Sequence, residues 1–301
     1  MKELRFSSYK LKCVATMGVF DGIHKGHIYL LEKLKKEANL HKLPSLVITF
    51  WPDPERLLKR NFLGYITNLE QKKKIFSDLG IDYILILKTN KSLLLLEGEK
   101  FLERIFRRIE IKSLVVGEDF SFGYKAKAGL SALAVFSSYK KFKLIVVKKK
   151  RIREEPVSSS LIRNLINKGE FRKAETLLGR KFVIWMRVIP GKGLGKKIGF
   201  PTLNLKNEGF VLPSRGIYAV KILNEKEYVG VCNIGFKPTV SKKNILSVEV
   251  HILNLDRSWG KKRVKMIFLE KIRKEKKFSD IESLKKAIQR DIEFTLTRYR
   301  V

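Results

Sequence analysis

The apolar residues in the first 180 positions fall into short continuous runs, separated by longer stretches with helical spacing. Five runs predict buried strands, at residues 11–16, 45–50, 83–87, 114–117 and 144–147. Four stretches predict helices: one that begins at Ile28, and those at residues 69–79, 99–108 and 161–178. Strands that are apolar throughout and alternate with helices are typical of a parallel sheet covered on both faces.

The pattern changes near Arg180. Short strands with alternating polarity then follow between Gly and Pro turns, at residues 182–185, 216–220, 228–231, 247–253 and 264–269. Such spacing favours a small antiparallel barrel or sandwich. The sequence Ser279-Asp280-Ile281-Glu282 has the pattern of a helix cap and predicts a C-terminal helix. We therefore predict two domains, residues 1–180 and residues 181–301.

Composition narrows the class of protein. The 301 residues are 44% hydrophobic, which is enough for packed cores, and no apolar run approaches the roughly 18–20 residues of a membrane span. The first residues lack the apolar segment of a signal peptide. Cys13 and Cys232 lie in strand-like runs without a metal-binding spacing. We expect a cytoplasmic protein without membrane association, either monomeric or weakly self-associating.

The net charge of +34 raises the question of nucleic-acid binding. Residues 181–301 hold 27 Lys and Arg against 11 Asp and Glu, so each predicted domain carries about half of the excess. Because the charge does not form a basic tail, a lysine-rich surface that attracts polyanions such as ATP is the favoured interpretation. A basic nucleic-acid-binding protein is the alternative.

The first candidate site is residues 17–27, Met-Gly-Val-Phe-Asp-Gly-Ile-His-Lys-Gly-His, which join a predicted strand to a helix. Backbone N–H groups and the helix dipole favour an anion at such a turn. The two histidines lie on the same side of the turn, and imidazoles there can stabilise charge on an α-phosphate. The simpler interpretation makes them ordinary polar residues at a helix start. We expect an ATP site with catalytic candidates His24 and His27, and with nucleotide contacts Gly18, Phe20 and Gly26.

A second phosphate-binding candidate is the run Val-Ser-Ser-Ser-Leu-Ile-Arg at residues 157–163. Its serines could simply cap the helix that begins here. Alternatively, the hydroxyls and the helix N–H groups hold phosphate oxygens, and an arginine one turn further supplies charge. The second interpretation gives the ATP-binding candidates Ser159, Ser160 and Arg163.

Together these two motifs resemble the HxGH and SSSxIR signatures of the prokaryotic bifunctional riboflavin kinase/FAD synthetase (FMN adenylyltransferase) family. Residues 49–54, Thr-Phe-Trp-Pro-Asp-Pro, and residues 117–123, Gly-Glu-Asp-Phe-Ser-Phe-Gly, match the same family in order. In that family these turns contact the flavin, which implies the flavin-side candidates Phe50, Pro52, Pro54, Asp119 and Phe122. Aromatic and proline surfaces suit a flat isoalloxazine ring, although core packing is the alternative for Phe120 and Phe122.

Residues 199–204, 233–239 and 248–251 resemble the flavokinase module of the same family, so the resemblance spans essentially the whole chain. Thr202 and Asn204 offer oxygen, the ligand type that Mg²⁺ prefers. Strand alternation places Glu249 and His251 on the face opposite the valines beside them. The resemblance implies that Glu249 is the general base and that Gly199 contacts ATP, whereas a solvated strand residue is the simpler interpretation of Glu249.

The chain departs from the family pattern at three places. Asp53 stands where the family usually has His, and Lys196, in the glycine-rich loop at residues 191–197, stands where the family typically has Arg. Lys keeps the charge but loses the bidentate fork. Residues 255–260, which include Trp259, differ from the usual Asp-Leu-Tyr-Gly. Arg273 and Glu275 match the Arg-x-Glu of the family, with a surface ion pair as the alternative.

The resemblance implies a Rossmann-like nucleotidyltransferase domain of α/β type, followed by an antiparallel β-barrel of riboflavin kinase type with a terminal helix. The implied activities are phosphorylation of riboflavin to FMN by ATP and Mg²⁺ in the second domain, and adenylylation of FMN to FAD in the first. The alternatives are a chain in which only one module is active, and the nucleic-acid-binding protein considered above.

Overall fold

The structure, a computed structural model, describes residues 1–4, 11–58, 62–152, 155–191, 193–223, 226–236, 246–255, 259–260 and 262–299. The chain divides into two compact units, Met1–Ser159 and Ser160–Val301, called the first and the second unit below. No helix in the described part of the chain is long and apolar enough to cross a membrane. The predicted boundary after residue 180 concerns the two activities and stays a prediction.

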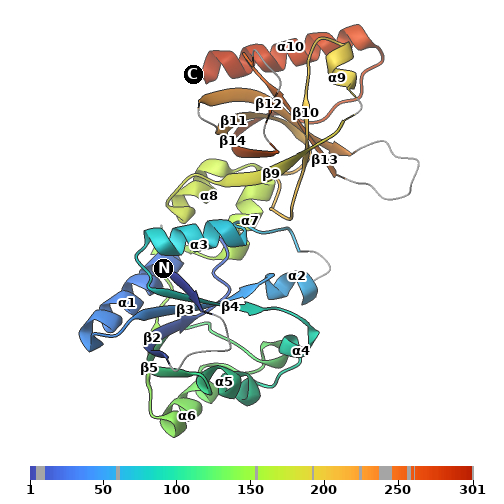
Figure 1. Ribbon diagram of the computed structural model, residues 1–301. Helices are drawn as coiled ribbons and strands as arrows, with labels where there is room; N and C mark the ends of the chain where they lie inside the picture. The colour runs from blue at the N-terminus through green and yellow to red at the C-terminus, as the bar shows by residue number, and fades with distance from the viewer. Residues whose placement is uncertain are drawn as a thin grey trace. The chain divides into compact units, whose positions relative to one another are not determined.

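The first unit is built on a six-stranded parallel sheet (Figure 1). In spatial order β1-β4-β3-β2-β5-β6, every neighbouring pair is parallel. The strands are β1 (Lys2–Leu4), β2 (Leu11–Met17), β3 (Ser45–Trp51), β4 (Tyr83–Lys88), β5 (Ile109–Gly117) and β6 (Lys143–Val147). Ligands bind to such sheets at the carboxyl ends of the strands, where the turns after β2, β3 and β5 lie.

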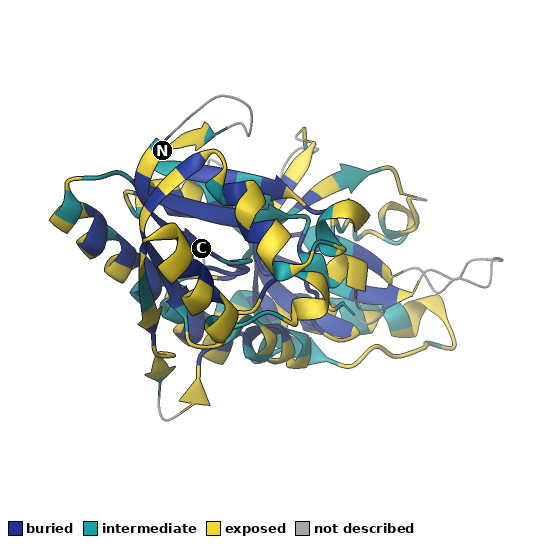
Figure 2. Ribbon diagram, turned by 90° about the horizontal axis from the view of Figure 1, so that it is seen from below, coloured by how far each residue is buried: buried dark blue, intermediate teal, exposed yellow. Residues whose placement is uncertain are grey.

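Helices cover both faces of this sheet, as the continuous apolar runs predict. Val14 and Val47 pack under α1 (Lys25–His41) and α3 (Leu69–Asp78). Cys13 and Ala15 face α5 (Gly98–Phe106) and α6 (Leu130–Lys140). Figure 1 shows α3 and α5 on opposite sides of the sheet, and Figure 2 shows buried residues running along the strands. The shorter elements are α2 (Pro54–Leu58), α4 (Lys91–Leu94), the 3₁₀ turn η1 (Tyr124–Ala126), β7 (Arg151–Ile152) and β8 (Glu155–Pro156).

The single helical stretch predicted at residues 161–178 is wrong, because the structure has two helices there. These are α7 (Ser159–Lys168) and α8 (Phe171–Leu178). The break falls at Gly169, which has φ +82°, a left-handed conformation that ends a helix and that glycine adopts without a steric penalty. The Gly169 N–H bonds to the Ile166 carbonyl oxygen as the first helix closes.

The second unit contains a closed antiparallel barrel, which confirms the predicted architecture. Its spatial order is β10-β13-β12-β11-β14-β9, and pairing of β10 with β9 closes it. The strands are β9 (Val183–Ile189), β10 (Leu203–Lys206), β11 (Gly216–Leu223), β12 (Glu227–Phe236), β13 (Leu246–Ile252) and β14 (Arg263–Arg273). A one-turn helix, α9 (Leu194–Lys197), precedes β10. Strand β10 is the one that the apolar pattern missed.

The predicted C-terminal helix is α10 (Ile281–Arg298). The Asp280 carboxylate caps it by accepting the Ser283 N–H at 2.7 Å. Ile292 packs against Val229 and Val231 of β12, which fastens the helix to the barrel wall.

Candidate active sites

The turn after β2 brings the two histidines into contact. His24 is the N-cap of α1, and its Nδ1 accepts the His27 backbone N–H at 3.3 Å. The two imidazole rings stack with centroids 3.7 Å apart and planes inclined by 15°. His24 is only 4% exposed, so it is a buried group at the helix start rather than a solvated one. The structure therefore places both histidines where the helix dipole favours an anion.

The turn is held in an unfavourable backbone conformation. Phe20 and Ile23 have φ +51° and +39°, a left-handed region that costs a residue with a side chain about 1–3 kcal/mol and persists only where neighbours enforce it. Asp21 supplies one constraint, because its carboxylate accepts the backbone N–H groups of Ile66 and Thr67 at 3.0–3.1 Å. The Thr67 hydroxyl oxygen accepts the Gly22 N–H at 2.9 Å. The segment before α3 thus shapes the histidine turn.

Two glycines of the turn leave room that the rings occupy. A Cβ on Gly26 would lie 3.1 Å from the His24 ring, and one on Gly18 would lie 3.2 Å from the Phe20 ring. The Phe20 ring contacts the His27 ring edge-on at 5.1 Å between centroids. The predicted nucleotide contacts Gly18, Phe20 and Gly26 therefore pack with the histidines as one cluster.

Ser159 of the serine-arginine motif contacts the histidine turn through one hydrogen bond. The Ser159 hydroxyl donates to the Asp21 carbonyl oxygen at 2.8 Å, which joins two positions 138 residues apart. Ser160 follows on α7 and is exposed, and Arg163, one turn further, is 5% exposed. The sequence predicts the two motifs separately, and the structure brings Ser159 and the histidine turn together.

The two predicted flavin turns share a packing partner in the first unit. Phe101 of α5 lies between them, with ring centroids 6.1 Å from Phe50 and 6.2 Å from Phe122. Phe50 is half-buried, whereas Phe122 is 6% exposed and belongs to the core, as the packing interpretation required. The remaining candidates differ in exposure: Asp119 is exposed and forms an ion pair with Lys149 at 2.9 Å, and Pro52 and Pro54 are partly exposed.

Asp53, the first departure from the family pattern, has a local structural role. Its carboxylate accepts the Glu55 N–H at 2.9 Å and its carbonyl oxygen accepts the Arg56 N–H at 3.0 Å, so it caps the short helix α2. The side chain is fully buried. Aspartate before Pro54 is a strong start signal for a helix, which accounts for this residue type without reference to the ligand.

In the second unit, Glu249 stands in a polar row across the barrel wall. It is paired with Asn204 of β10 on one side and with Asn233 of β12 on the other. Directly paired residues on neighbouring strands share a face, so the three side chains lie side by side. Val248, Val250 and Ile252 are buried on the opposite face, which confirms the predicted alternation. Burial, and then the charge of Glu249, raise the pKa of the Cys232 thiol.

Asn233 belongs to the motif at residues 233–239 but is not among the residues predicted to form the site. Its Oδ1 is buried and has no hydrogen-bond partner among the described residues. A buried acceptor without a donor is costly unless a ligand or water supplies one. Its place opposite Glu249 depends on the register between β12 and β13, which the local pattern does not reveal.

The glycine-rich loop lies against the two predicted Mg²⁺ ligands. A Cβ on Gly191 would be 2.0 Å from the Asn204 amide nitrogen, and one on Gly195 would be 3.1 Å from the Thr202 hydroxyl oxygen. Gly199 has φ +90°, which a residue with a side chain rarely adopts. Lys196 is exposed on α9, and Lys192 lies outside the described residues.

Among the described residues no group of three His, Cys, Asp or Glu forms a metal site. A Mg²⁺ held by one hydroxyl, one amide and substrate phosphates fits this donor set.

Arg273 and Glu275, which match the family pattern, have different partners in the structure. Arg273 does not pair with Glu275, because its guanidinium makes a bidentate contact with the buried Asp291 of α10 at 2.7–2.9 Å. The Glu275 carboxylate instead lies over Gly235, where a Cβ would be 2.1 Å from its Oε1. Trp259 contacts Tyr228 edge-on. Residues 237–239 and 256–258 of the quoted motifs lie outside the described residues.

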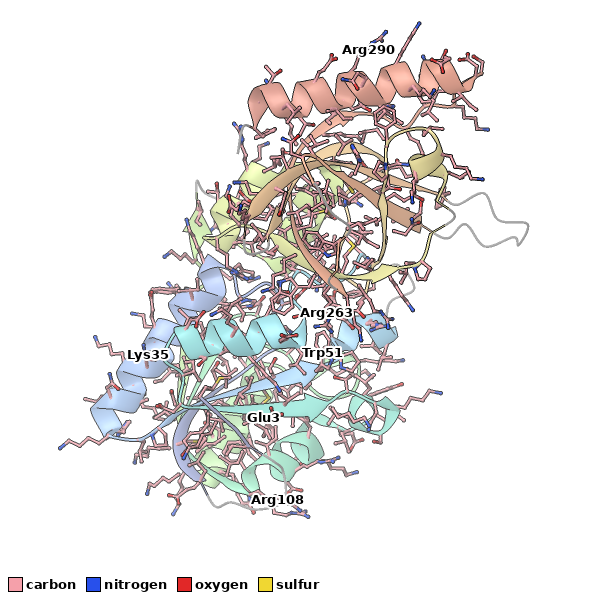
Figure 3. The ribbon with its side chains drawn as sticks, turned by 45° about the horizontal axis from the view of Figure 1, so that its top comes forward. Glu3, Lys35, Trp51, Arg108, Arg263 and Arg290 are labelled. Carbon is pink, nitrogen blue, oxygen red and sulfur yellow. The ribbon has the colours of Figure 1, made fainter. Side chains whose placement is uncertain are left out.

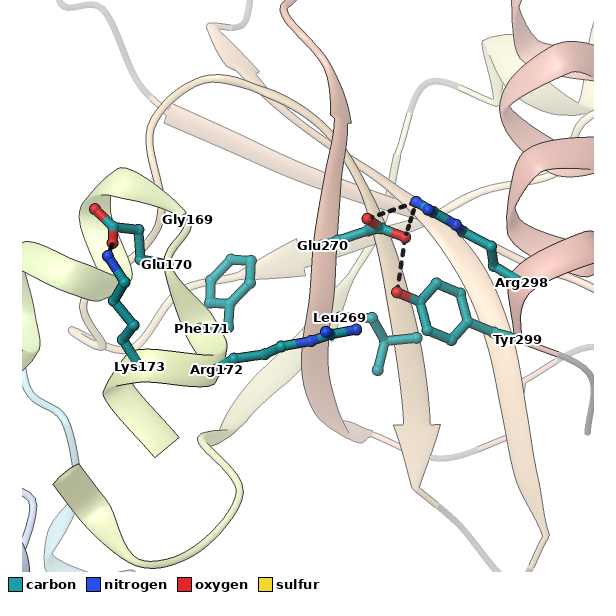
Figure 4. A pocket seen from close by; sticks show the side chains of 9 residues that line it. All are labelled: Gly169, Glu170, Phe171, Arg172, Lys173, Leu269, Glu270, Arg298 and Tyr299. Carbon is teal, nitrogen blue, oxygen red and sulfur yellow. Dashed lines mark hydrogen bonds and ion pairs between the residues drawn. The ribbon is translucent and has the colours of Figure 1, made fainter. Parts of the chain in front are cut away.

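A separate cavity of about 460 Å³ lies between the start of α8 and the end of the barrel (Figure 4). Glu270 lies at its wall and accepts hydrogen bonds from Arg298 and from the Tyr299 hydroxyl. Burial, together with this carboxylate, raises the pKa of Tyr299 to about 12. The lining that the structure describes contains none of the predicted site residues.

The first unit therefore has the organisation of nucleotide-binding α/β proteins, and the second is a closed antiparallel barrel with a polar row on its wall. A family model for FAD synthetase matches residues 7–161, and one for riboflavin kinase matches residues 178–298. The chain belongs to the bifunctional riboflavin kinase/FMN adenylyltransferase family, as its relatives also indicate.

Two such relatives carry that name. The protein from Buchnera aphidicola subsp. Schizaphis graminum is 36% identical over 92% of this chain and 91% of its own length. The protein from Escherichia coli K12 is 32% identical over 93% of this chain and 90% of its own length. Among solved structures, the crystal structure of a macrolide-efflux protein from Streptococcus pneumoniae matches 96% of this chain and 95% of that chain. Its TM-score is 0.81 and its identity 26%.

Proposed function

We propose that this chain makes FAD from riboflavin in two steps at two sites, in keeping with its family. Residues 181–301 transfer the γ-phosphoryl group of ATP to riboflavin and form FMN, and residues 1–180 join the AMP part of a second ATP to FMN. The observation that carries this is the presence of both family domains in order, each with its polar motif assembled.

For adenylyl transfer, we assign to His24 and His27 the stabilisation of charge on the α-phosphate. A phosphate oxygen of FMN attacks the α-phosphorus, the bond to the bridging oxygen breaks, and pyrophosphate leaves. Positioning and charge stabilisation supply most of the catalysis in such transfers. Ser159, Ser160 and Arg163 would hold phosphate oxygens. Since Ser159 bonds to the turn, we propose that residues 1–180, which include α7, carry this activity.

For phosphorylation, we assign to Glu249 the removal of the proton from the 5′-hydroxyl of riboflavin. The freed oxygen attacks the γ-phosphorus, the bond to the β-phosphate oxygen breaks, and ADP leaves. Thr202 and Asn204 would hold Mg²⁺, which neutralises phosphate charge when bound. Gly199 would let the backbone approach ATP. Residues 181–301 carry this activity in our proposal.

On the flavin side of the first unit, we propose contacts from the two turns that flank Phe101. Phe50, Pro52 and Pro54 of the first turn are partly exposed, and Asp119 of the second turn is exposed. Phe122 is buried, so a contact of its ring with flavin stays a prediction and its packing against Phe101 is what the structure supports.

The test is one incubation with riboflavin, ATP and Mg²⁺, followed by chromatographic separation of FMN from FAD. We expect FMN first and FAD later, with pyrophosphate released in step with FAD and no product when EDTA replaces Mg²⁺. FMN without FAD would leave only the second site active and would point to the departure at Asp53, whereas FAD from supplied FMN but no FMN from riboflavin would leave only the first site active and would point to the departure at Lys196. A second incubation with FMN and ATP isolates the first site. Formation of neither product would overturn the proposal.

A further inference from the structure

Lys72 is a buried lysine in the first unit that none of the motifs includes. It lies in the first turn of α3, four residues after the Asn68 cap, and its relative exposure is 0%. Lysine is almost never fully buried unless its ammonium is paired or hydrogen-bonded, because removing the charge from water is costly. We therefore expect the Lys72 ammonium to have specific partners, and these partners indicate the role of the side chain.

The ammonium contacts both turns that the motifs assign to the first site. Lys72 Nζ donates to the Val19 carbonyl oxygen at 2.7 Å, inside the histidine turn. It also lies 5.6 Å from the ring centroid of Trp51, next to the predicted flavin contacts; Figure 3 labels this tryptophan. The Thr49 hydroxyl donates to the same Val19 oxygen at 3.1 Å. One backbone carbonyl thus receives two buried side-chain donors.

Holding this carbonyl orients the next N–H. In a planar trans peptide, the carbonyl of Val19 and the N–H of Phe20 point in opposite directions. The N–H of Phe20 accordingly points away from Lys72, and it makes no hydrogen bond within the residues that the structure describes. Phe20 has a positive φ that its surroundings must enforce. A free, fixed N–H donor beside the stacked histidines is what a nucleotide phosphate requires.

We propose that Lys72 is a positioning residue for adenylyl transfer. By holding the Val19 carbonyl oxygen, the ammonium directs the Phe20 N–H toward the ATP phosphates. Its charge also adds to the positive potential at the histidine turn. This inference rests on the proposed function of the first site. Lys72 acts through the backbone and does not touch the reacting atoms.

The test replaces Lys72 with methionine, which has a similar length and no donor. The matched control is Lys74→Met on the same helix, because Lys74 is exposed and pairs with Asp78. Since a displacement of about 1 Å can cost about 10²-fold in rate, we expect kcat for FAD formation to fall about 30- to 100-fold in Lys72→Met. KM for ATP should change less than about threefold. The control should retain the parent rate.

Each rate is divided by the number of FAD molecules that the chain binds at saturation, so that misfolded chains do not lower the apparent kcat. FMN formation by the second unit is measured in the same samples and should stay at the parent value. An unchanged kcat per FAD site in Lys72→Met would overturn the proposal. So would a loss that appears only as a reduced number of FAD sites, since that is the result of a purely structural role.

Thr49→Val tests the same carbonyl in case Lys72→Met does not fold. It removes the second donor at nearly constant volume, and Thr49→Ser keeps the hydroxyl. We expect about a tenfold lower kcat for valine and recovery for serine; equal rates for all three residues would contradict the proposal. If the parent chain makes FAD and the variants make FAD at the parent rate, only the proposed role of Lys72 is wrong. If the parent makes no FAD, the proposed function itself fails.

Discussion

The two candidate sites are built on different parts of their folds. In the first unit, the histidine turn lies beyond a strand end, and its shape depends on Ile66, Thr67 and Ser159, which are 45 to 138 residues away from Asp21. In the barrel, Glu249 lies within a strand that is hydrogen-bonded on both sides. The turn should therefore respond to substitutions at distant supports, whereas the barrel site should respond to changes in the strands and loop that touch it.

The largest expected effect is at Glu249. Glu249→Gln keeps the strand position and removes the base, so FMN formation should fall about 10²- to 10⁴-fold. FAD formation from supplied FMN should stay at the parent rate. Both products are measured by chromatography, with Glu227→Gln on β12 as the control, since that residue is exposed and paired with Lys221. Parallel loss of both reactions would contradict the separation of the sites.

The converse substitution is His27→Ala. Losing one group that stabilises charge in the transition state costs about 10²- to 10³-fold, so FAD formation should fall by that factor while FMN accumulates from riboflavin. His41→Ala, a histidine at the other end of α1, serves as the control. If His27→Ala forms FAD at the rate of the control, the assignment of the stacked histidines is wrong.

Gly195→Ala tests whether the barrel site responds to a change in the loop that touches it. The added Cβ would lie 2.3 Å from the Phe200 carbonyl oxygen and 3.1 Å from the Thr202 hydroxyl oxygen, so the loop must shift. We expect about a tenfold higher KM for ATP in FMN formation and no change in FAD formation from FMN. Gly129→Ala, where nothing lies within 4 Å of the new Cβ, is the control. Steady-state kinetics with each flavin separate the two outcomes.

The smallest expected effect is on the stability of the first unit, at a site remote from both motifs. Glu37 of α1 is buried and its carboxylate accepts hydrogen bonds from Lys143, Ser113 and His41. Burial alone would raise its pKa, but these contacts outweigh it and hold the pKa below 4.5. Because the folded pKa is depressed, the stabilisation is present at neutral pH and is lost as the pH falls below about 4.5.

Glu37→Gln should therefore lower the free energy of unfolding by about 1–2 kcal/mol at pH 7, and the difference from the parent should shrink toward pH 4. Urea unfolding is followed through Trp51 in a background in which Trp185 and Trp259 are replaced by phenylalanine. A difference that stays constant between pH 7 and pH 4 would show that the charge of Glu37 is not what stabilises the fold.

The sequence predicts most strands of both units, from continuous apolar runs in the first unit and from alternating polarity in the second. It misses α6, because Val135 and Tyr139 on the solvent side blur the helical spacing of Leu133 and Phe136. It misses β10 because that strand has only four residues. It predicts one helix where Gly169 separates two, although a glycine in a helical pattern is a recognisable warning.

The residues of the candidate sites can also be predicted only in part from the sequence, because some of their contacts join distant segments. His24, His27 and Glu249 occur in local motifs, so these residues can be picked out from the chain itself, whereas the pairing of Glu249 with Asn204 and Asn233 depends on strand register. The contacts of Asp21 with Thr67 and Ser159 cannot, because they depend on how distant segments pack. The burial of Lys72 is harder still to predict, since a lysine in an amphipathic helix ordinarily faces solvent.

The most direct test of two separable sites uses the two inactivated chains together. Given riboflavin, ATP and Mg²⁺, His27→Ala alone should yield FMN, and Glu249→Gln alone should leave riboflavin unchanged. An equimolar mixture should yield FAD, because the Glu249→Gln chain adenylylates the FMN that the His27→Ala chain releases. A mixture that forms no FAD, while the parent chain does, would contradict the account.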